Sequence, residues 1–383
     1  MVRMNPIYLD HAATSPIHPE VLKVMLPALE NVYGNPSSIH HYGRKARQAL
    51  DEARRVAAAS IHANEKNITF TSGGTEADNL ALIGTANANK RKGMHIITTT
   101  IEHHAVLHAA NYLEEQGFEI TYLPVHPSGQ ISVTDLEKAL RDDTILVSIM
   151  TVNNETGVIQ PVEEIGHLLK EHQAVFHTDA VQAYGALDID VDRLGVDLLS
   201  VSSHKISGPK GVGFLYTRDR IKLSAQLFGG EQERKRRPGT ENVAGIIGFQ
   251  KAIELVNKER DTRVQTYQDL KQLFINTLKA ESVDFEVNGD RTNTVSTIVN
   301  VSFPGANVES LLTNFDLSGI AASSGSACTA GSVEPSHVLS AMYGSSDDRT
   351  TNSIRFSFGL ANSKEQVKEA ASKVAVILKR LVK

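Results

Sequence analysis

DLLSVSSHKISGPKGVGFLYT, from Asp197 to Thr217, contains the pattern from which the fold class follows. It holds two short apolar runs, DLLSVSS and GVGFLYT, and each has the length and the β-branched or aromatic residues of a buried strand. Lys205 follows the first run and precedes a Gly-Pro turn. A lysine that is partly buried at a strand end can have a lowered pKa and act as an amine nucleophile, although most lysines are solvated surface residues.

Five similar runs precede this stretch, and helical patterns lie between several of them. The runs are ITFTS (68–72), HIITTT (95–100), ITYLP (120–124), ILVSIMTV (145–152) and AVFHTDA (174–180). The helical patterns cover residues 75–88, 104–116 and 162–171. This alternation predicts an α/β fold with a mostly parallel seven-stranded sheet that helices cover on both faces. Ligands in such sheets bind at the carboxyl ends of the strands.

The pattern changes after Gly245, where a long helical region extends to about Ala280. The later patterns are a strand over 294–303, a helix over 308–315, a strand over 353–359 and a last helix to Leu381. We therefore expect two domains in the 383 residues. The large domain covers residues 15–259, and a smaller α+β domain covers residues 1–14 and 260–383.

The composition is that of a globular protein, with a formal net charge of -5 and no tryptophan. A general nucleic-acid binder would carry a basic surface, so we expect no direct contact with nucleic acid. No stretch has the apolar length of a signal peptide or a membrane span, so we expect a cytoplasmic protein without membrane contact. That compartment is reducing and keeps thiols available for chemistry.

The chain has one cysteine, Cys328, within SSGSACTAGS (Ser323 to Ser332). A single thiol can form no internal disulfide and no thiolate cage for zinc or an iron–sulfur cluster. It is either a small buried apolar residue or a reactive thiol, and the cysteine by itself does not decide between these. No metal site is expected, because adjacent histidines such as His103 and His104 point apart and no other ligand spacing is present.

Two further motifs lie at predicted strand ends. In TSGGTEADN (71–79), Gly74 and Thr75 stand where a strand gives way to a helix, whose free N–H groups suit a phosphate. The same pattern is also typical of an ordinary turn and helix cap. In HTDAVQ (177–182), Asp179 ends an apolar strand, where a carboxylate needs a cation or hydrogen bonds, unless it caps the next helix.

Taken together, Lys205, Asp179 and the glycine-rich helix start are more specific than any one of them. Pyridoxal phosphate requires a lysine for a Schiff base, an acid for its protonated ring nitrogen and a binding site for its phosphate. The three features fall on three strand ends of one predicted sheet. They therefore predict a site for this cofactor.

The sequence also resembles the NifS/IscS-type cysteine desulfurases of the class V aminotransferase family over essentially its whole length. The matching segments are YLDHAAT (8–14), GNPSS (34–38), TSGGTEADN, EHHAV (102–106), NNETG (153–157), HTDAVQ, SSHK (202–205), RPGTEN (237–242), SSGSACTAG and SIRFSFG (353–359). The resemblance implies the fold type I of pyridoxal phosphate-dependent transferases. It also implies that L-cysteine is converted to L-alanine while its sulfur passes to Cys328 as a persulfide.

Roles of single residues in the cofactor site follow from the resemblance. Lys205 would hold the cofactor covalently, Asp179 would pair with its ring nitrogen, and Gln182 would bond its ring hydroxyl. His103 would stack on the ring and move protons, and Asn154 would help to fix both cofactor and substrate. These residues would tune the cofactor as an electron sink.

The resemblance further implies how the phosphate and the substrate are held. Thr75, Ser202 and His204 would bind the phosphate beside Gly74, with Thr240 reaching in from the other subunit of a homodimer. Arg355 would bind the substrate carboxylate, because a guanidinium can donate two parallel hydrogen bonds to a carboxylate. The loop that carries Cys328, about residues 322–333, would belong to the smaller domain.

Several alternatives stay open. A selenocysteine lyase, or another aminotransferase or lyase that uses the same cofactor, would share most of these residues, and a cofactor-free persulfide carrier would need only Cys328. The sulfur acceptor is either a tRNA 2-thiolase or an iron–sulfur scaffold protein. Family members that serve a scaffold often extend past the last helix, whereas this chain stops at Lys383. The tRNA pathway is therefore kept as a hypothesis.

Overall fold

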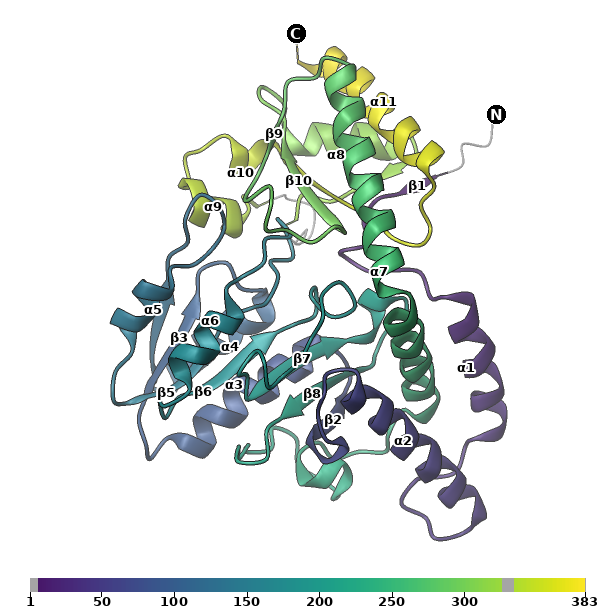
Figure 1. The fold of residues 1–383 in the computed structure, drawn as a ribbon, viewed down its shortest axis with the longest axis vertical. Coiled ribbons are helices and arrows are strands. Elements are labelled where there is room, and N and C mark those ends of the chain that lie inside the picture. The colour runs from purple at the N-terminus through teal and green to yellow at the C-terminus, as the bar shows by residue number, and fades with distance from the viewer. Residues whose placement is uncertain (1–5, 326–333, 383) are drawn as a thin grey trace.

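The computed structural model describes residues 6–325 and 334–382, and its central feature is one mixed seven-stranded sheet (Figure 1). The strands are β2 (Ile68–Thr71), β3 (His95–Thr99), β4 (Glu119–Leu123), β5 (Thr144–Ser148), β6 (Val175–Asp179), β7 (Leu198–Ser202) and β8 (Gly213–Thr217). Their order is β2-β8-β7-β6-β5-β3-β4. β8 runs antiparallel to both neighbours, and the other pairs are parallel. The predicted α/β class is confirmed.

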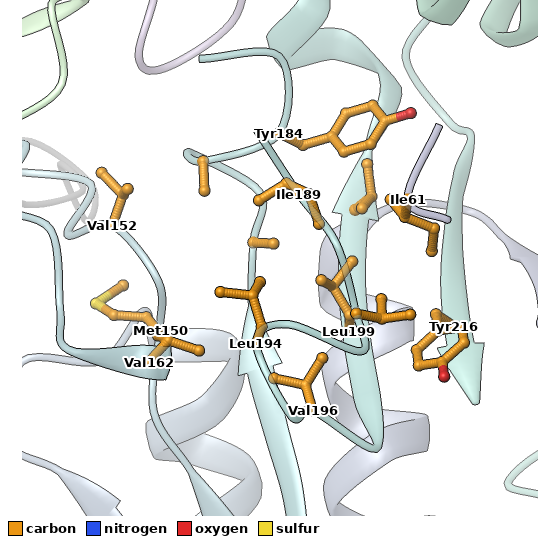
Figure 2. Close-up of a cluster of buried hydrophobic side chains, with 14 of the residues drawn as sticks. Ile61, Met150, Val152, Val162, Tyr184, Ile189, Leu194, Val196, Leu199 and Tyr216 are labelled. Carbon is orange, nitrogen blue, oxygen red and sulfur yellow. The ribbon is translucent and has the colours of Figure 1, made fainter. Parts of the chain in front are cut away.

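Helices cover both faces of this sheet. They are α1 (Pro19–Asn31), α2 (His41–Ala59), α3 (Gly74–Asn89), α4 (His104–Glu115), α5 (Val133–Ala139), α6 (Val162–Leu169) and α7 (Val243–Ala280), with short 3-10 turns at Glu65–Asn67, Ser203–Ile206 and Gln232–Lys235. Leu198 packs into a core under α3 and α4, and Leu199 packs into a core under α2, α6 and α7. Figure 2 shows part of the latter core, including Met150, Val152 and Leu199. Apolar residues therefore face both sides, as a sheet covered on both faces requires.

A separate apolar core lies at the other end of α7 (Figure 1). It contains residues of β1 (Ile7–Tyr8), β9 (Glu286–Val287), β10 (Ile298–Ser302), α8 (Val308–Leu317), β11 (Ile320–Ala321), β12 (Ser353–Ser357) and α11 (Lys364–Leu381). In the same part of the sequence, α9 (His337–Tyr343) packs against the sheet core, and α10 (Arg349–Asn352) is a short helix before β12. α7 contributes Phe249 to the sheet core and Phe274 to this one. The domain bounds at residues 15 and 260 stay a prediction. No helix in the described ranges is long and apolar enough to cross a membrane.

The strand predicted over residues 294–303 is shorter in the structure. β10 begins at Ile298, because the residues before it bond to other parts of the chain. Thr294 forms an isolated bridge with Val158, and the Val295 N–H donates to Gly157 O at 2.9 Å. Lys271 Nζ also donates to Thr294 Oγ1 and to Val295 O, both at 3.0 Å. These contacts bend the segment toward the turn that follows β5.

A buried ion pair fixes the edge strand β2. The Arg54 guanidinium on α2 donates to Glu233 Oε2 at 2.7 Å and to Oε1 at 2.6 Å, and both side chains are less than a tenth exposed. Glu233 Oε2 also accepts from Phe70 N at 2.8 Å, and Arg54 donates to Ile68 O at 2.7 Å. The pair therefore ties α2 and the 232–235 turn to the strand that leads into Gly74.

Replacing Glu233 with glutamine should destabilise the protein strongly, because it leaves the buried Arg54 charge without its counter-charge. We expect a loss of about 3–5 kcal/mol in the free energy of unfolding, measured by urea denaturation of the holoenzyme. Glu119→Gln is the matched control, since Glu119 pairs with Arg141 at the surface. Its cost should stay below about 1 kcal/mol. Equal losses in the two variants would contradict the importance of the buried pair.

Candidate active site

A pocket of about 340 Å³ lies at the edge of the sheet where β2, β6 and β7 end. Most of the predicted site residues line it, and they are Gly74, Thr75, His103, Asn154, Asp179, Gln182, Ser202, His204, Lys205 and Arg355. Thr240 is exposed and does not line this pocket. Cys328 lies outside the described residues. The structure thus brings together side chains from strand ends that are far apart in the sequence.

The Lys205 amine lies in the turn after β7 and is held against the N-terminal segment. Its Nζ donates to Ala13 O at 2.9 Å and also to Ala12 O. Burial lowers the pKa of Lys205 to about 8, and the positive charge of Arg355 contributes to this lowering. At neutral pH, the fraction of Lys205 that is neutral is therefore larger than that of an ordinary lysine. The neutral amine is the nucleophilic form.

Asp179 and Gln182 lie next to this amine at the end of β6. Asp179 Oδ1 accepts from Val181 N at 2.8 Å, and the Gln182 amide donates to Ala12 O at 3.0 Å. Burial raises the pKa of Asp179 to about 6, against the lowering by the Val181 N–H and the Lys205 charge. A bound cation would favour the ionised form of this carboxyl group.

Part of the pocket wall suits an anion. α3 starts at Gly74 without a side-chain cap, so its first N–H groups are free, and Ser202 and His204 line the same pocket. Burial, with the charge of Lys205, lowers the pKa of His204 to about 4, which leaves the ring neutral. A Cβ atom at Gly74 would lie 2.8 Å from Val181 Cγ2. Glycine there lets the start of α3 lie close to Val181, and the N–H groups at the start of a helix are the kind of site that phosphate groups use.

His103 lines the pocket from the start of α4. Its Nδ1 accepts from Ala105 N at 3.1 Å and caps the helix, so the ring proton is on Nε2. Burial, with the charge of Lys205, lowers the pKa of His103 to about 4. The ring is therefore neutral, and it has a flat face and one N–H to offer to a ligand.

Arg355 on β12 is the cation of the pocket wall, and its side chain is only 5% exposed. It donates to Asn154 O at 2.9 Å and to Asp10 Oδ1 at 3.0 Å. Arg355 Nε and Asn154 Oδ1 are both buried and have no hydrogen-bond partner among the described residues. A buried donor or acceptor without a partner is costly unless a ligand satisfies it.

Sequence reasoning assigned no role to several residues that line the pocket. They include Asp78, His104, Met150, Glu155, Val181 and His337. Asp78, His104 and Glu155 lie within the motifs TSGGTEADN, EHHAV and NNETG, so the sequence pointed to this part of the pocket through their neighbours. His337 comes from α9 and had none, yet its ring centroid lies 4.8 Å from that of His104. In the part of the chain that the structure describes, no group of three or more His, Cys, Asp and Glu side chains could hold a metal.

This set of groups fits pyridoxal phosphate. Lys205 offers an amine with a lowered pKa, Asp179 a buried carboxyl group, and the α3 start with Ser202 a site for the phosphate. The unpaired Asn154 Oδ1 offers an acceptor on the wall. Each of the three requirements of the cofactor thus has a matching group in one pocket.

The reactivity of Lys205 should therefore depend on pH with a midpoint near 8. Only the neutral amine attacks an aldehyde, so the rate of adduct formation should rise as pH passes through the pKa. The measurement is the absorbance change when pyridoxal phosphate is added to the apoenzyme between pH 6.5 and 9.5, values that span about one and a half units on each side. The Lys205→Ala variant should not show this absorbance change. It still contains Lys271, whose pKa burial also lowers to about 8. A rate that still rises steeply at the top of this range would contradict the assignment.

Comparison with known proteins gives a consistent result. The family profile described as Aminotransferase class-V matches residues 7–369. A protein of Bacillus subtilis (strain 168) named "Putative cysteine desulfurase IscS 1" is 60% identical over 378 residues, which is 99% of this chain and 100% of the relative. A solved structure described as "NIFS-LIKE PROTEIN" has a TM-score of 0.92 at 34% identity and covers 98% of this chain and 100% of its own. Another, "SspA in complex with cysteine", has a TM-score of 0.82 at 37% identity, over 92% of this chain and 98% of its own.

The match to the family profile and the identity to the relative both extend over nearly the whole chain, and the pocket holds the groups that the cofactor of this family requires. The chain belongs to the class-V aminotransferase family and, within it, to the NifS/IscS-type cysteine desulfurases, which depend on pyridoxal phosphate.

Proposed function

We propose that this protein removes sulfur from L-cysteine, releases L-alanine and carries the sulfur on Cys328 as a persulfide. The observation that carries the proposal is the meeting of an amine, a buried carboxyl group and a buried guanidinium in one pocket, from Lys205, Asp179 and Arg355. The relatives named as cysteine desulfurases, and the related structure that holds cysteine, support the choice of substrate.

When bound, pyridoxal phosphate supplies an electron sink for the carbon atoms of the substrate. Lys205 would hold the cofactor, and its amine would be suited to accept the α-proton of the substrate, because a pKa of about 8 suits proton transfer at neutral pH. Asp179 pairs with the ring nitrogen, and the neutral His103 stacks on the ring. Arg355 binds the substrate carboxylate, using the Nε–H that has no partner in the described part of the protein.

The remaining proposed contacts orient the bound groups. Gln182 bonds the ring hydroxyl, and Asn154 fixes cofactor and substrate. The phosphate is held by Gly74, Thr75, Ser202 and His204, all of which line the pocket. Because these side chains project from the ends of a rigid sheet, they can hold the substrate in one orientation.

Sulfur transfer is then a thiol exchange at the substrate sulfur. The Cys328 thiolate forms an S–S bond as the C–S bond of cysteine breaks, and the carbon takes up a proton to become the methyl group of alanine. The atoms balance, since cysteine and a thiol give alanine and a persulfide. Ser323 and Gly325, which line the pocket, lead into the segment that carries Cys328.

Replacing Cys328 with alanine should separate substrate binding from turnover. The variant should keep the cofactor absorbance and its change on cysteine binding, whereas alanine release should fall by about a hundredfold or more, because the nucleophile is gone. Mass spectrometry should find the persulfide in the wild type, where Cys328 is the only cysteine. Lys205→Ala is the control that should lose the cofactor spectrum as well. Undiminished alanine release by the Cys328 variant would refute the proposal.

We further propose that the active protein is a homodimer in which Thr240 contacts the phosphate in the partner's pocket. Thr240 is exposed, and large apolar side chains are also exposed on the protein surface, with Phe228 and Ile39 both 91% exposed and Leu29 62%. Such surfaces usually pack against another protein. Sedimentation of the holoenzyme as a single 41.7 kDa chain would contradict the dimer.

The sulfur then passes from Cys328 to an acceptor protein. The IscS names of the relatives favour an acceptor in iron–sulfur cluster assembly, and a tRNA 2-thiolase is the alternative. Transfer of labelled sulfur from the Cys328 persulfide to each purified acceptor decides between the two. The cytoplasmic location stays a prediction.

A further inference from the structure

A second cavity lies between the C-terminal half of α7 and the segment 283–294, apart from the active-site pocket. Its volume is about 420 Å³, and it has no lining residue in common with the active-site pocket. Sites for small molecules have volumes of about 300–1,000 Å³. The cavity is therefore large enough for a small ligand, and the proposed reaction does not use it.

Lys271 places an amine without a counter-charge in the wall of this cavity. The residue is 8% exposed, and its Nζ donates to Thr294 Oγ1 and to Val295 O, both at 3.0 Å. Both acceptors are neutral, and an ammonium group has a third N–H to donate. Within residues 6–325 and 334–382, Lys271 forms no ion pair. A buried amine of this kind suits an anionic ligand, which would supply both the missing charge and an acceptor.

The side chain of Asn288 adds an unpaired acceptor to the same wall. Asn288 is 1% exposed, and its Nδ2 donates to Asn300 Oδ1 at 2.8 Å and to Ser353 Oγ at 2.9 Å. Asn300 is fixed in turn, because its own Nδ2 donates to Glu155 O at 3.2 Å. These bonds hold the Asn288 amide in one orientation, and its Oδ1 is buried with no hydrogen-bond partner in the described part of the chain. A ligand N–H or O–H would satisfy this oxygen.

Apolar side chains form another part of the wall. They are Ile275 on α7, together with Val283, Phe285, Val287 and Val299. All but Val299 are only partly buried, although they pack against the core at this end of α7. Part of their apolar surface is therefore available to a ligand in the cavity.

We propose that this cavity binds a small carboxylic acid that carries an amino or hydroxyl group and an apolar side chain. The ligand carboxylate pairs with Lys271, its N–H or O–H donates to Asn288 Oδ1, and its side chain packs against Phe285 and the neighbouring apolar groups. Apolar amino acids and the corresponding 2-hydroxy acids share this chemistry. The inference does not depend on the reaction at Lys205, because the two sites have no lining residue in common.

The test is isothermal titration calorimetry of the holoenzyme with L-phenyllactate, which has no amine that could react with the cofactor. Lys271→Met should weaken binding about tenfold or more, because the charged partner of the carboxylate is lost. Lys258→Met is the matched control, since Lys258 is an exposed lysine on the same helix, and its affinity should equal that of wild type. Ile275→Trp fills the cavity without removing Lys271 or Asn288, and it should abolish binding.

The variants should all keep the cofactor absorbance of the wild type, because none of the substituted residues lines the active-site pocket. Binding that is as strong in Lys271→Met and Ile275→Trp as in wild type would place L-phenyllactate elsewhere, for example at Arg355, and would refute the proposal. The proposal is equally refuted if neither L-phenyllactate nor L-phenylalanine binds at millimolar concentration.

Two related compounds test the groups of the ligand one at a time. 3-Phenylpropanoate lacks the hydroxyl group and should bind about fivefold or more weakly, because Asn288 Oδ1 stays unpaired. 3-Phenylpropane-1,2-diol lacks the carboxylate and should not bind. Equal affinity of all three compounds would contradict the assigned contacts. The ratio of the affinities of L-phenylalanine and L-phenyllactate identifies whether the site prefers amino acids or hydroxy acids.

The affinity for L-phenyllactate should also depend on pH, because only the charged Lys271 amine pairs with a carboxylate. Burial lowers the pKa of Lys271 to about 8, so the affinity should fall about tenfold from about pH 7 to about pH 9. The other ionisable residues that line the cavity are Lys279, Asp284, Asp290 and Arg291, and side chains of these types ordinarily titrate outside this range. An affinity that is the same at both pH values would contradict the pairing with Lys271.

Discussion

The buried guanidinium of Arg355 joins three segments of the chain that build the pocket. It bonds to Asp10 from the N-terminal segment and to the backbone of Asn154 from the turn after β5, and its own backbone pairs with Ser323 beyond β11. A buried cation must keep its partners, because an unpaired charge in the interior costs several kcal/mol, of the order of 3–5 when one partner is removed. The same charge acts across the pocket and contributes to the lowered pKa of Lys205. One residue therefore links three walls of the pocket and also contributes, after burial, to the reactivity of the Lys205 amine.

Burial favours the neutral form of several ionisable groups in and near the pocket. It raises the pKa of Asp179 to about 6 and that of Glu102 to about 8, and it raises that of Asp78 well above its usual range. It lowers the pKa of Lys205 to about 8 and that of His103 to about 4. The neutral forms of the acidic and of the basic side chains are favoured, because burial excludes the water that stabilises their charged forms. A ligand that brings a positive ring nitrogen and a negative phosphate supplies the charges that the carboxyl groups and the free N–H groups of α3 can pair with.

The sequence allowed the sheet to be predicted well, because its strands are buried on both faces and appear as continuous apolar runs. The site could be predicted to the extent that its residues follow those strands, as Asp179 and Lys205 do. The roles of the single residues stay predictions. The sequence did not show His337 as a member of the pocket, because its place depends on how α9 packs against the NNETG turn. Nor could it show that Lys271 bends the chain before β10, since a buried lysine looks like a surface lysine in a sequence.

The width of the pocket depends on how the two cores are held together. Lys205 is attached to the sheet core and Arg355 to the other core, so any relative movement of the cores would change the distance between amine and guanidinium. α7 opposes such movement, since one continuous helix of 38 residues packs into both cores. The bridge between Val158 and Thr294 and the bond from Arg355 to Asn154 O add cross-links next to the pocket itself. A substrate held at both ends by these two walls needs a spacing fixed to within a fraction of an ångström, of the order of 0.5 Å. A long helix shared between the cores provides this constraint at a distance from the chemistry, and it leaves the pocket side of both cores free for side chains that bind and react.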